Sequence, residues 1–316
     1  MTQLIRRCLH SGLQVLITLW GVTFLTFSLS FLAPGDPVSM LLETGDTIVS
    51  QETIEETRHE MGLDKPFIVQ YGNWLIHVVQ GDLGMSYSAK KPVIDKMIEA
   101  LPGTLLLASV TIVMMLLMAI PLGIVSAVYQ NRWPDLLLRG IAFFGISVPT
   151  FWLGLMLLYI FGYKLNLVPI ATSTVSFKNV VLPAFTLAFT MMAKYMRQVR
   201  LVILEEINKE YVVGARVRGM APMTIMFHHI LPNSLLPLLT ILGLSCGWLL
   251  GGVAVIEMIF AWPGLGKMAV NAIAMRDYPL IQGFVLWAAL AYMIINGVID
   301  RMYPYLDPRL RRGGQR

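Results

Sequence analysis

Six apolar runs, each long enough to cross a lipid bilayer as a helix, dominate the sequence. A helix needs about 20 residues to cross about 30 Å of hydrocarbon. The runs are Leu9–Leu32, Leu101–Tyr129, Leu136–Phe161, Val180–Leu201, Leu231–Ile256 and Leu280–Ile299. Hydrophobic residues make up 56% of the chain and charged residues only 14%, which excludes an ordinary soluble domain. We therefore expect an all-α integral membrane protein with six transmembrane helices.

The first run is predicted to stay in the membrane rather than to be removed as a signal peptide. Arg6 and Arg7 precede it, as in a signal peptide, but its 24 residues exceed a typical signal core, and no convincing small-residue cleavage site follows. The sequence thus divides into the N-terminus with the first span (residues 1–32), a long loop (33–100), a core of five spans (101–303) and a short tail (304–316).

The distribution of basic residues predicts how the spans are oriented. If the N-terminus is cytoplasmic, 15 of the 24 lysines and arginines lie inside and nine outside. Five of those nine belong to the long loop, and long loops carry little weight in the positive-inside rule. Both termini are therefore predicted to be cytoplasmic, in the cell inner (plasma) membrane. The basic residues flank apolar runs and form no basic face, so the net charge of +5 does not point to nucleic acid.

The long outer loop carries its own helix signals. It holds 11 of the 19 acidic residues. Ser50 is suited to cap a helix that Gly62 ends, Pro66 to open a second helix, and Pro92 to start a third that leads into the second span. We expect a small helical cap on the extracytoplasmic surface.

The spans lack the groups that drive transport in other membrane proteins. No acidic or basic residue or histidine is expected in the middle of a span, which disfavours an ion-coupled carrier. Gly266-Lys267 lacks the upstream glycine of the phosphate-binding motif and is followed by Met268 instead of Ser or Thr, so the chain is not expected to be an enzyme. Its two cysteines and five histidines show no metal-site spacing, so we expect no bound metal or cofactor.

Prolines within the apolar runs are predicted to kink their helices, because each one removes a backbone donor. They are Pro121, Pro149, Pro183 and Pro237.

The one sizeable inside loop, residues 203–230, is predicted to form two short helices that meet at a bend. Gly219 suits the left-handed position that closes a helix, and Pro222 suits the first turn of the next one. The second helix would present Met223, Ile225, Met226 and Phe227 just outside the membrane. Such an apolar knob fits either a groove on a cytoplasmic partner or the lipid headgroups, and the residues alone leave both open.

This loop resembles the coupling loop of binding-protein-dependent ABC importer permeases through Gly214-Ala215, Gly219 and Leu231-Pro232. It departs from the family pattern at Val213 and His229. Other motifs resemble the dipeptide, oligopeptide and nickel permeases of that family: Pro34-Gly35-Asp36-Pro37, Gly62–Pro66 with Gln70-Tyr71, Gly81–Gly84, Leu101-Pro102 with Thr104-Leu105, Pro149–Gly154, Phe260–Gly266, Arg276–Pro279 with Gln282, and Asp307–Arg311.

The resemblance implies a type I ABC importer permease, with a coupling helix and no catalytic residue. Its partners would be a second related permease, two ATP-binding cassette subunits, an extracytoplasmic solute-binding protein and membrane lipid. ATP would be hydrolysed by those partner subunits. The residues implied in ATPase coupling are Gly214, Ala215, Gly219, Ala221, Pro222, Met223, Met226, Phe227, Leu231 and Pro232.

A possible outer gate loop comprises Trp262, Pro263, Gly264 and Gly266, where the two glycines would supply flexibility or an ordinary tight turn. The stretches Phe151–Leu153 and Ile256–Gly264 are most similar to nickel-type permeases. They favour nickel or a metal chelate over a di- or oligopeptide as the solute. A stand-alone channel or facilitator, and a membrane assembly factor, are the competing classes.

Overall fold

The computed structural model describes residues 2–306 except 34–37, 39–41, 43–49 and 172–173. Within these residues the regular structure is helical, apart from one isolated β-bridge between Met85 and Pro92. The chain forms two compact units. The first comprises Met1–Pro102 and Gly264–Met293, and the second comprises Gly103–Pro263 and Ile294–Arg316.

The first unit contains the helices of the long loop, residues 33–100, and their ends confirm the helix signals expected there. Helix α3 (Gln51–Glu60) begins after Ser50, whose hydroxyl accepts from the Thr53 amide, and Gly62 follows its end with φ of +65°. Helix α4 (Phe67–Val79) follows Pro66 directly. Pro92 precedes α5 (Val93–Val128), which runs without a break into the second apolar run.

An aromatic cluster joins α1 (Thr2–Leu32) to α4 within this unit. The rings of Phe24 and Phe27 meet the ring of Tyr71 edge to face, with centroids 5.5 Å apart in each case. The hydroxyls of Tyr71 and Thr23 lie 3.1 Å apart. A second small core forms where α5 begins, around Val93 and Met97, with residues of α12 (Leu265–Ala274) and of the first turn of α13 (Tyr278–Leu306).

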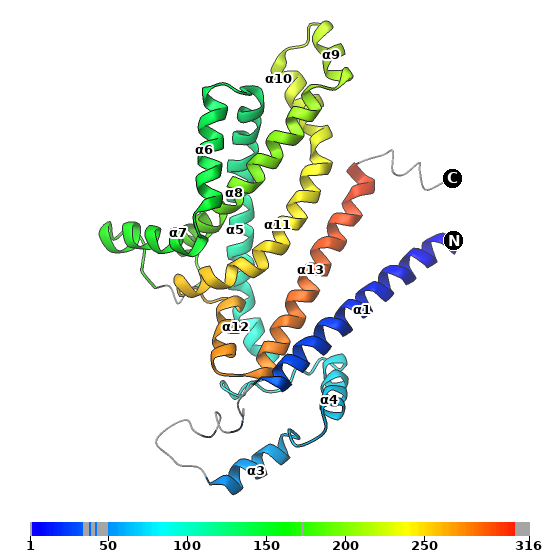
Figure 1. The fold of residues 1–316 in the computed structure, drawn as a ribbon, viewed down its shortest axis with the longest axis vertical. Coiled ribbons are helices and arrows are strands. Elements are labelled where there is room, and N and C mark those ends of the chain that lie inside the picture. Colours follow the sequence, from blue (N-terminus) through cyan, green and yellow to red (C-terminus); the bar gives the residue numbers. More distant parts are fainter. Residues whose placement is uncertain (1, 34–37, 39–41, 43–49, 172–173, 307–316) are drawn as a thin grey trace. The chain divides into compact units, whose positions relative to one another are not determined.

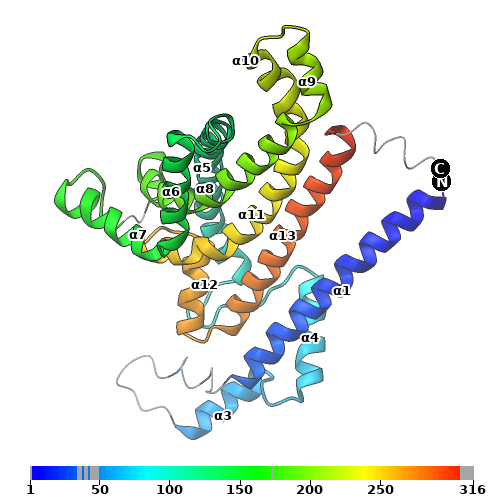
Figure 2. The same cartoon turned by 45° about the horizontal axis from the view of Figure 1, so that its top comes forward.

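Helix α8 (Phe177–Ile207) is the central element of the second unit. Both ribbon views show it among α5, α6 (Trp133–Ser147) and α11 (Leu231–Ile259) (Figures 1 and 2). Small residues let these helices approach closely. A Cβ at Gly123 would lie 2.6 Å from the Val199 side chain, and one at Gly145 would lie 2.8 Å from Ala193. Close packing of small residues is how membrane helices associate without a hydrophobic driving force.

The third apolar run is not one helix, and the prediction of a single span over Leu136–Phe161 is wrong in that respect. Helix α6 ends at Ser147, and α7 (Thr150–Leu157), continued by the π-helical η1 (Leu158–Lys164), leaves at an angle of 99°. Pro149 has no amide to donate, and it holds the residue before it in extended backbone. The predicted kink is thus a full corner. The other three prolines lie inside the continuous helices α5, α8 and α11.

Four helices of the described residues are long and apolar enough to cross a membrane alone: Gly12–Leu32, Val93–Val128, Pro222–Gly247 and Tyr278–Ile299. The bent pair of α6 with α7 and η1 makes a fifth if it counts as one span. Helix α8 is long enough but more polar. The structure therefore confirms an all-helical protein with four to five apolar spans, whereas six spans stay a prediction.

Candidate functional site

The inside loop forms the predicted bent helix pair. Helix α9 (Glu210–Val217) ends before Gly219, which has a φ of +76°, and Pro222 is the first residue of α10 (Pro222–Ile225). The Gly219 amide donates to the Arg216 carbonyl at 2.9 Å, and the Met220 amide donates to the Ala215 carbonyl at 3.2 Å. A left-handed residue followed by such reverse hydrogen bonds is the usual glycine ending of a helix. The bend is thus fixed by local backbone geometry.

Only part of the predicted apolar knob faces outward. Met223 is 70% exposed and Phe227 is 51% exposed, whereas Ile225 and Met226 are buried in the core of the second unit. The expectation that Ile225 and Met226 belong to the exposed knob is therefore wrong. The chain passes from α10 into one π-helical segment, η2 (Met226–Ile230), before α11, and Ile225, Met226 and Ile230 form the buried side of these two segments. Met223 and Phe227 remain as the exposed apolar pair.

The other residues assigned to this loop support its shape. Gly214 and Ala215 lie within α9, and Ala215 is buried. Ala221 precedes the first residue of α10 in extended backbone. Leu231 and Pro232 are the first two residues of α11, where a proline needs no amide partner. These residues form the turn and the start of α11, the helix that follows it.

The base of the loop is tied to α8 by a buried carboxylate that sequence reasoning missed. Glu206 accepts from the Tyr211 hydroxyl at 2.7 Å and from the Lys209 ammonium. Burial and this hydrogen bond raise the pKa of Tyr211 to about 12, so its hydroxyl stays protonated as a donor. Because Glu206 is in the last turn of α8, the start of α9 is held to the end of that helix.

A second missed feature is the buried carboxylate of Asp135, near the start of α6. It accepts from the Arg200 guanidinium twice, at 2.9 Å each, from the Ser126 hydroxyl at 2.6 Å and from the Asn131 amide at 2.9 Å. These partners belong to α8, to α5 and to the turn between α5 and α6. Two features of the sequence could have indicated this pair: Asp135 directly precedes the third apolar run, and Arg197 and Arg200 lie near the end of the fourth.

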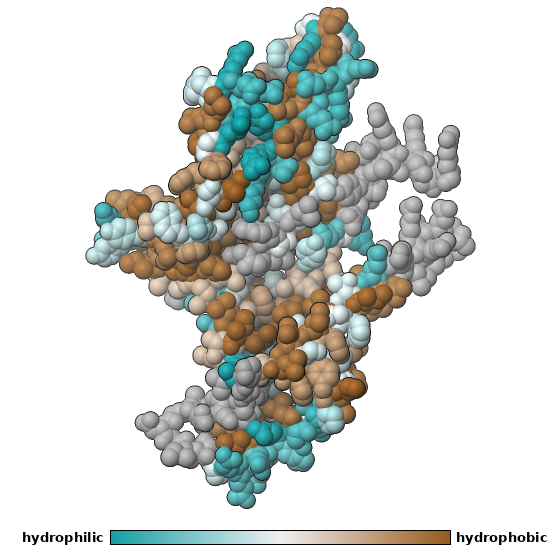
Figure 3. Space-filling view, in the orientation of Figure 1, coloured by the Kyte–Doolittle hydropathy of each residue, from teal (hydrophilic) through white to brown (hydrophobic). Residues whose placement is uncertain are grey.

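An apolar groove of about 780 Å³ lies between the loop and the ends of α5 and α8. We call it the inner groove. Its apolar walls come from Ile120, Pro121, Ile124, Val125, Ala127 and Val128 of α5, from Leu204 and Ile207 of α8, and from Pro222, Met223, Ile225, Met226, Phe227, Ile230 and Leu231. Its polar lining residues are Tyr129, Gln130, Arg132, Asn208 and Arg216. Hydrophilic residues gather over the end of the second unit that carries α9 and α10, and hydrophobic ones over α7 (Figure 3).

The segment considered as an outer gate is a turn that leads into α12. Trp262 is fully buried, and its indole donates to the Gly103 carbonyl at 2.9 Å. Pro263 follows, Gly264 caps α12 in extended backbone, and Gly266 is buried inside that helix. Neither glycine has a positive φ, whereas Ala261 does, at 52°. A gating role for these residues stays a prediction.

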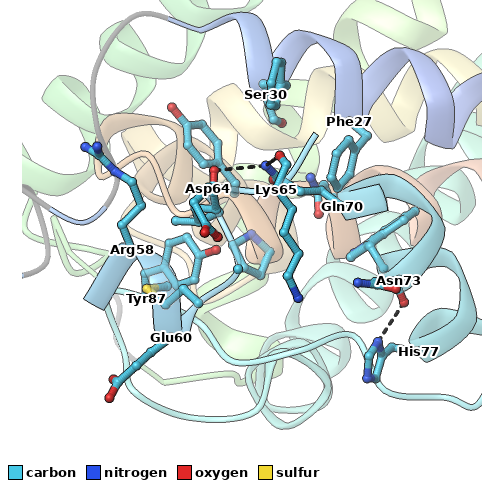
Figure 4. A pocket seen from close by; sticks show the side chains of 18 of the residues that line it. Phe27, Ser30, Arg58, Glu60, Asp64, Lys65, Gln70, Asn73, His77 and Tyr87 are labelled. Carbon is cyan, nitrogen blue, oxygen red and sulfur yellow. Dashed lines mark hydrogen bonds between the residues drawn. The ribbon is translucent and has the colours of Figure 1, made fainter. Parts of the chain in front are cut away.

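The first unit contains an outer pocket of about 800 Å³ (Figure 4). Its charged lining residues carry both signs and include Arg58, Glu60, Asp64 and Lys65. A hydrogen bond of 2.6 Å from the His59 ring holds the pKa of the Asp64 carboxyl below its usual range.

Tyr87 also lines the outer pocket. Its neighbours Ser86 and Ser88 are hydrogen-bonded to one carboxylate, that of Asp277. The buried Asp277 accepts from the Ser86 hydroxyl at 2.6 Å and from the Ser88 hydroxyl and amide at 2.7 and 2.9 Å. Burial and the nearby Asp277 raise the pKa of Tyr87 to about 12. Among the described residues, no three histidine, cysteine or acidic side chains gather as a metal site would require.

Comparisons with known proteins cover nearly the whole chain. Residues 119–312 match the family described as "Binding-protein-dependent transport system inner membrane component", and residues 1–108 match the N-terminal model of the same kind of membrane component. The "Probable D,D-dipeptide transport system permease protein DdpB" of Escherichia coli is 37% identical, over 93% of this chain and 94% of the relative.

The "Nickel import system permease protein NikB" of Staphylococcus aureus is 36% identical, over 98% of this chain and 92% of the relative. A similar fold occurs in the MetNI methionine ABC transporter, solved in inward-facing conformations. That match has a TM-score of 0.54 and 18% identity, and it covers 68% of this chain and 97% of the other.

Proposed function

Since this chain belongs to the family of binding-protein-dependent transport system inner membrane components, and is thus a permease subunit of an ABC importer, we propose that it forms half of a translocation pore. A second related permease would form the other half. Two ATP-binding cassette subunits would hydrolyse ATP on the cytoplasmic side, and a solute-binding protein would deliver the solute outside. The absence of a phosphate-binding loop from the sequence supports leaving hydrolysis to those subunits.

The observation that carries this proposal is the inside loop with its exposed pair, Met223 and Phe227. The loop is held at one end by Glu206 and bent by Gly219 and Pro222. It would therefore move as a rigid body and pass a movement of the ATPase on to the helices. An exposed apolar pair on such a loop suits a groove on an ATPase. Burying each side chain there would contribute about 1.5 to 3 kcal/mol if it were fully desolvated.

Gly219→Val is expected to uncouple ATP hydrolysis from import while leaving membrane insertion unchanged. A β-branched residue at a φ of +76° is strained by about 1 to 3 kcal/mol, and the strain falls on the bend rather than on the spans. Phe227→Asp is expected to weaken assembly, because a charge would enter the apolar contact. Both variants are measured for membrane level, solute-stimulated ATP hydrolysis and import in the assembled complex.

Gly140→Ala is the control, at a glycine outside the loop. Gly140 lies in α6 without a positive φ and has nothing within 4 Å of its would-be Cβ. It should behave like the parent. If Gly219→Val and Phe227→Asp also hydrolyse ATP and import solute like the parent, the loop is not the coupling element, and an interfacial helix on lipid headgroups replaces it.

We propose that both termini are cytoplasmic, on the basis of the 15 to 9 charge asymmetry. In a background without Cys8 and Cys246, Glu55→Cys is expected to react with a membrane-impermeant maleimide in intact cells. Gly314→Cys should react only after permeabilisation. Labelling of position 314 in intact cells would reverse the topology.

For the solute, we propose nickel or a metal bound to a small chelator, supported by the Phe151–Leu153 and Ile256–Gly264 stretches and by the nickel-import relative. The relative named for D,D-dipeptide transport supports a peptide as the second candidate. The cognate solute-binding protein discriminates between them. Calorimetry with free nickel, nickel chelates and dipeptides should give tight binding for one class, and tight dipeptide binding would overturn the nickel proposal.

A further inference from the structure

We propose that the inner groove binds a phospholipid of the cytoplasmic leaflet with an anionic headgroup, placing one acyl chain along α5 and the phosphate at Arg132 and Arg216. The inference rests on the proposed orientation, which sets residues 203–230 on the cytoplasmic side. The groove shares Met223 and Phe227 with the proposed ATPase contact, and the proposal concerns its remaining walls, on α5 and at Ile225 and Ile230.

The depth of the groove indicates an occupant from the membrane. Its lining residues run from Gln130, just past the end of α5, back along that helix to Ile120. Ten residues of helix at about 1.5 Å each make about 15 Å, which is half of a hydrocarbon core of about 30 Å. A groove of this depth crosses one leaflet. A soluble subunit docked below the membrane does not reach Ile120.

The walls of the groove suit an acyl chain along this depth. The groove is open to the surroundings along α5, where Pro121, Val125 and Val128 are exposed. Across from them, Ile225, Met226 and Ile230 form a buried apolar floor. A flexible hydrocarbon chain fills an irregular apolar channel without requiring polar partners. The walls themselves therefore select for hydrocarbon and not for a peptide backbone.

The charged residues that line the groove are both positive. Among the described lining residues, Arg132 and Arg216 are the charged ones, and neither pairs with a carboxylate of the described residues. The nearest buried carboxylates are already engaged, Asp135 by Arg200 and Glu206 by Lys209. Basic pockets at the cytoplasmic ends of membrane helices bind acidic lipid headgroups. Two arginines with no counter-charge favour an anionic over a zwitterionic headgroup.

Lipid occupancy of the groove is tested by photo-crosslinking. The assembled importer is reconstituted in phosphatidylcholine vesicles that contain a trace of diazirine-tailed phosphatidylglycerol or, separately, of diazirine-tailed phosphatidylcholine. Crosslinked peptides are mapped by mass spectrometry. We expect phosphatidylglycerol to label residues 120–132 and 222–231 in preference to phosphatidylcholine.

The double variant Arg132→Gln/Arg216→Gln should lower that preference about 30-fold, which corresponds to about 1 kcal/mol for each arginine. Arg139→Gln/Arg218→Gln is the matched control. Both of its arginines are exposed, lie in the same segments and do not line the groove. It should keep the preference of the parent.

A third variant, Val125→Trp, fills the groove without touching either arginine and should remove labelling by both lipids. It keeps the test decisive if the double variant does not accumulate. Equal lipid preference in the parent and the arginine double variant, or no preference between the two lipids in the parent, would each overturn the proposal. Gly219→Val should leave the labelling intact, so failure of the coupling proposal is distinguished from failure of this one.

Discussion

Gly103→Ala is expected to prevent the chain from accumulating as a folded membrane protein. A Cβ at this position would lie 1.9 Å from the carbonyl oxygen of Pro263 and 2.9 Å from its carbonyl carbon. Both atoms are backbone, so no rotamer change relieves the collision. The adjacent Trp262 is fully buried and donates to the Gly103 carbonyl, which holds the two segments together. We expect a loss of about 3 kcal/mol or more, the upper end for overpacking in a core.

The measurement is fluorescence-detected size-exclusion chromatography of the extracted chain, followed by thermal unfolding of the monodisperse peak. Gly140→Ala is the matched control, since Gly140 is exposed on α6 and has nothing within 4 Å of its would-be Cβ. Alanine in an exposed helix interior is favoured over glycine by about 1 kcal/mol, so the control should be at least as stable as the parent. A Gly103→Ala variant that melts with the parent would show that this contact has room to relax.

Local signals in the sequence predicted the helix boundaries that depend on neighbouring residues alone. Ser50, Pro66, Pro92, Gly219 and Pro222 each stand where the structure begins or ends a helix. Caps and left-handed glycine endings are set by the backbone conformation of one or two residues, so a short stretch of sequence is sufficient to specify them.

Features that depend on tertiary packing were not predictable in the same way. A proline in an apolar run indicates a kink but not its size, and the 99° corner at Pro149 depends on how α6 and α7 pack. Ile225, Met226 and Ile230 occupy the buried side of their segment, and which side of so short a helix packs inward depends on its neighbours in the fold. The pairing of Asp135 with Arg200 joins residues 65 apart, and no local pattern specifies such a partner.

Arg200→Met is the second change with a large expected effect, because it leaves the Asp135 carboxylate buried without its main partner. Asp135 has no exposed surface, and Arg200 is its closest cation, in a two-bond contact with both oxygens at 2.9 Å. Removing one partner of a buried pair costs about 3 to 5 kcal/mol, since the remaining charge stays desolvated. The Ser126 and Asn131 donors still bind the carboxylate, so we expect the lower half of that range.

A double-mutant cycle separates this pair from a general loss of packing. Arg139 lies 3.9 Å from the same carboxylate but is half exposed, so Arg139→Met should cost less than about 1 kcal/mol. Asp135→Asn combined with Arg200→Met removes both charges and should recover part of the stability lost in Arg200→Met alone. Thermal unfolding of the parent, Asp135→Asn, Arg200→Met and the double variant in one detergent gives the coupling energy. If the double variant is no more stable than Arg200→Met, the guanidinium acts through packing rather than through its charge, and α8 is held to α6 by shape alone.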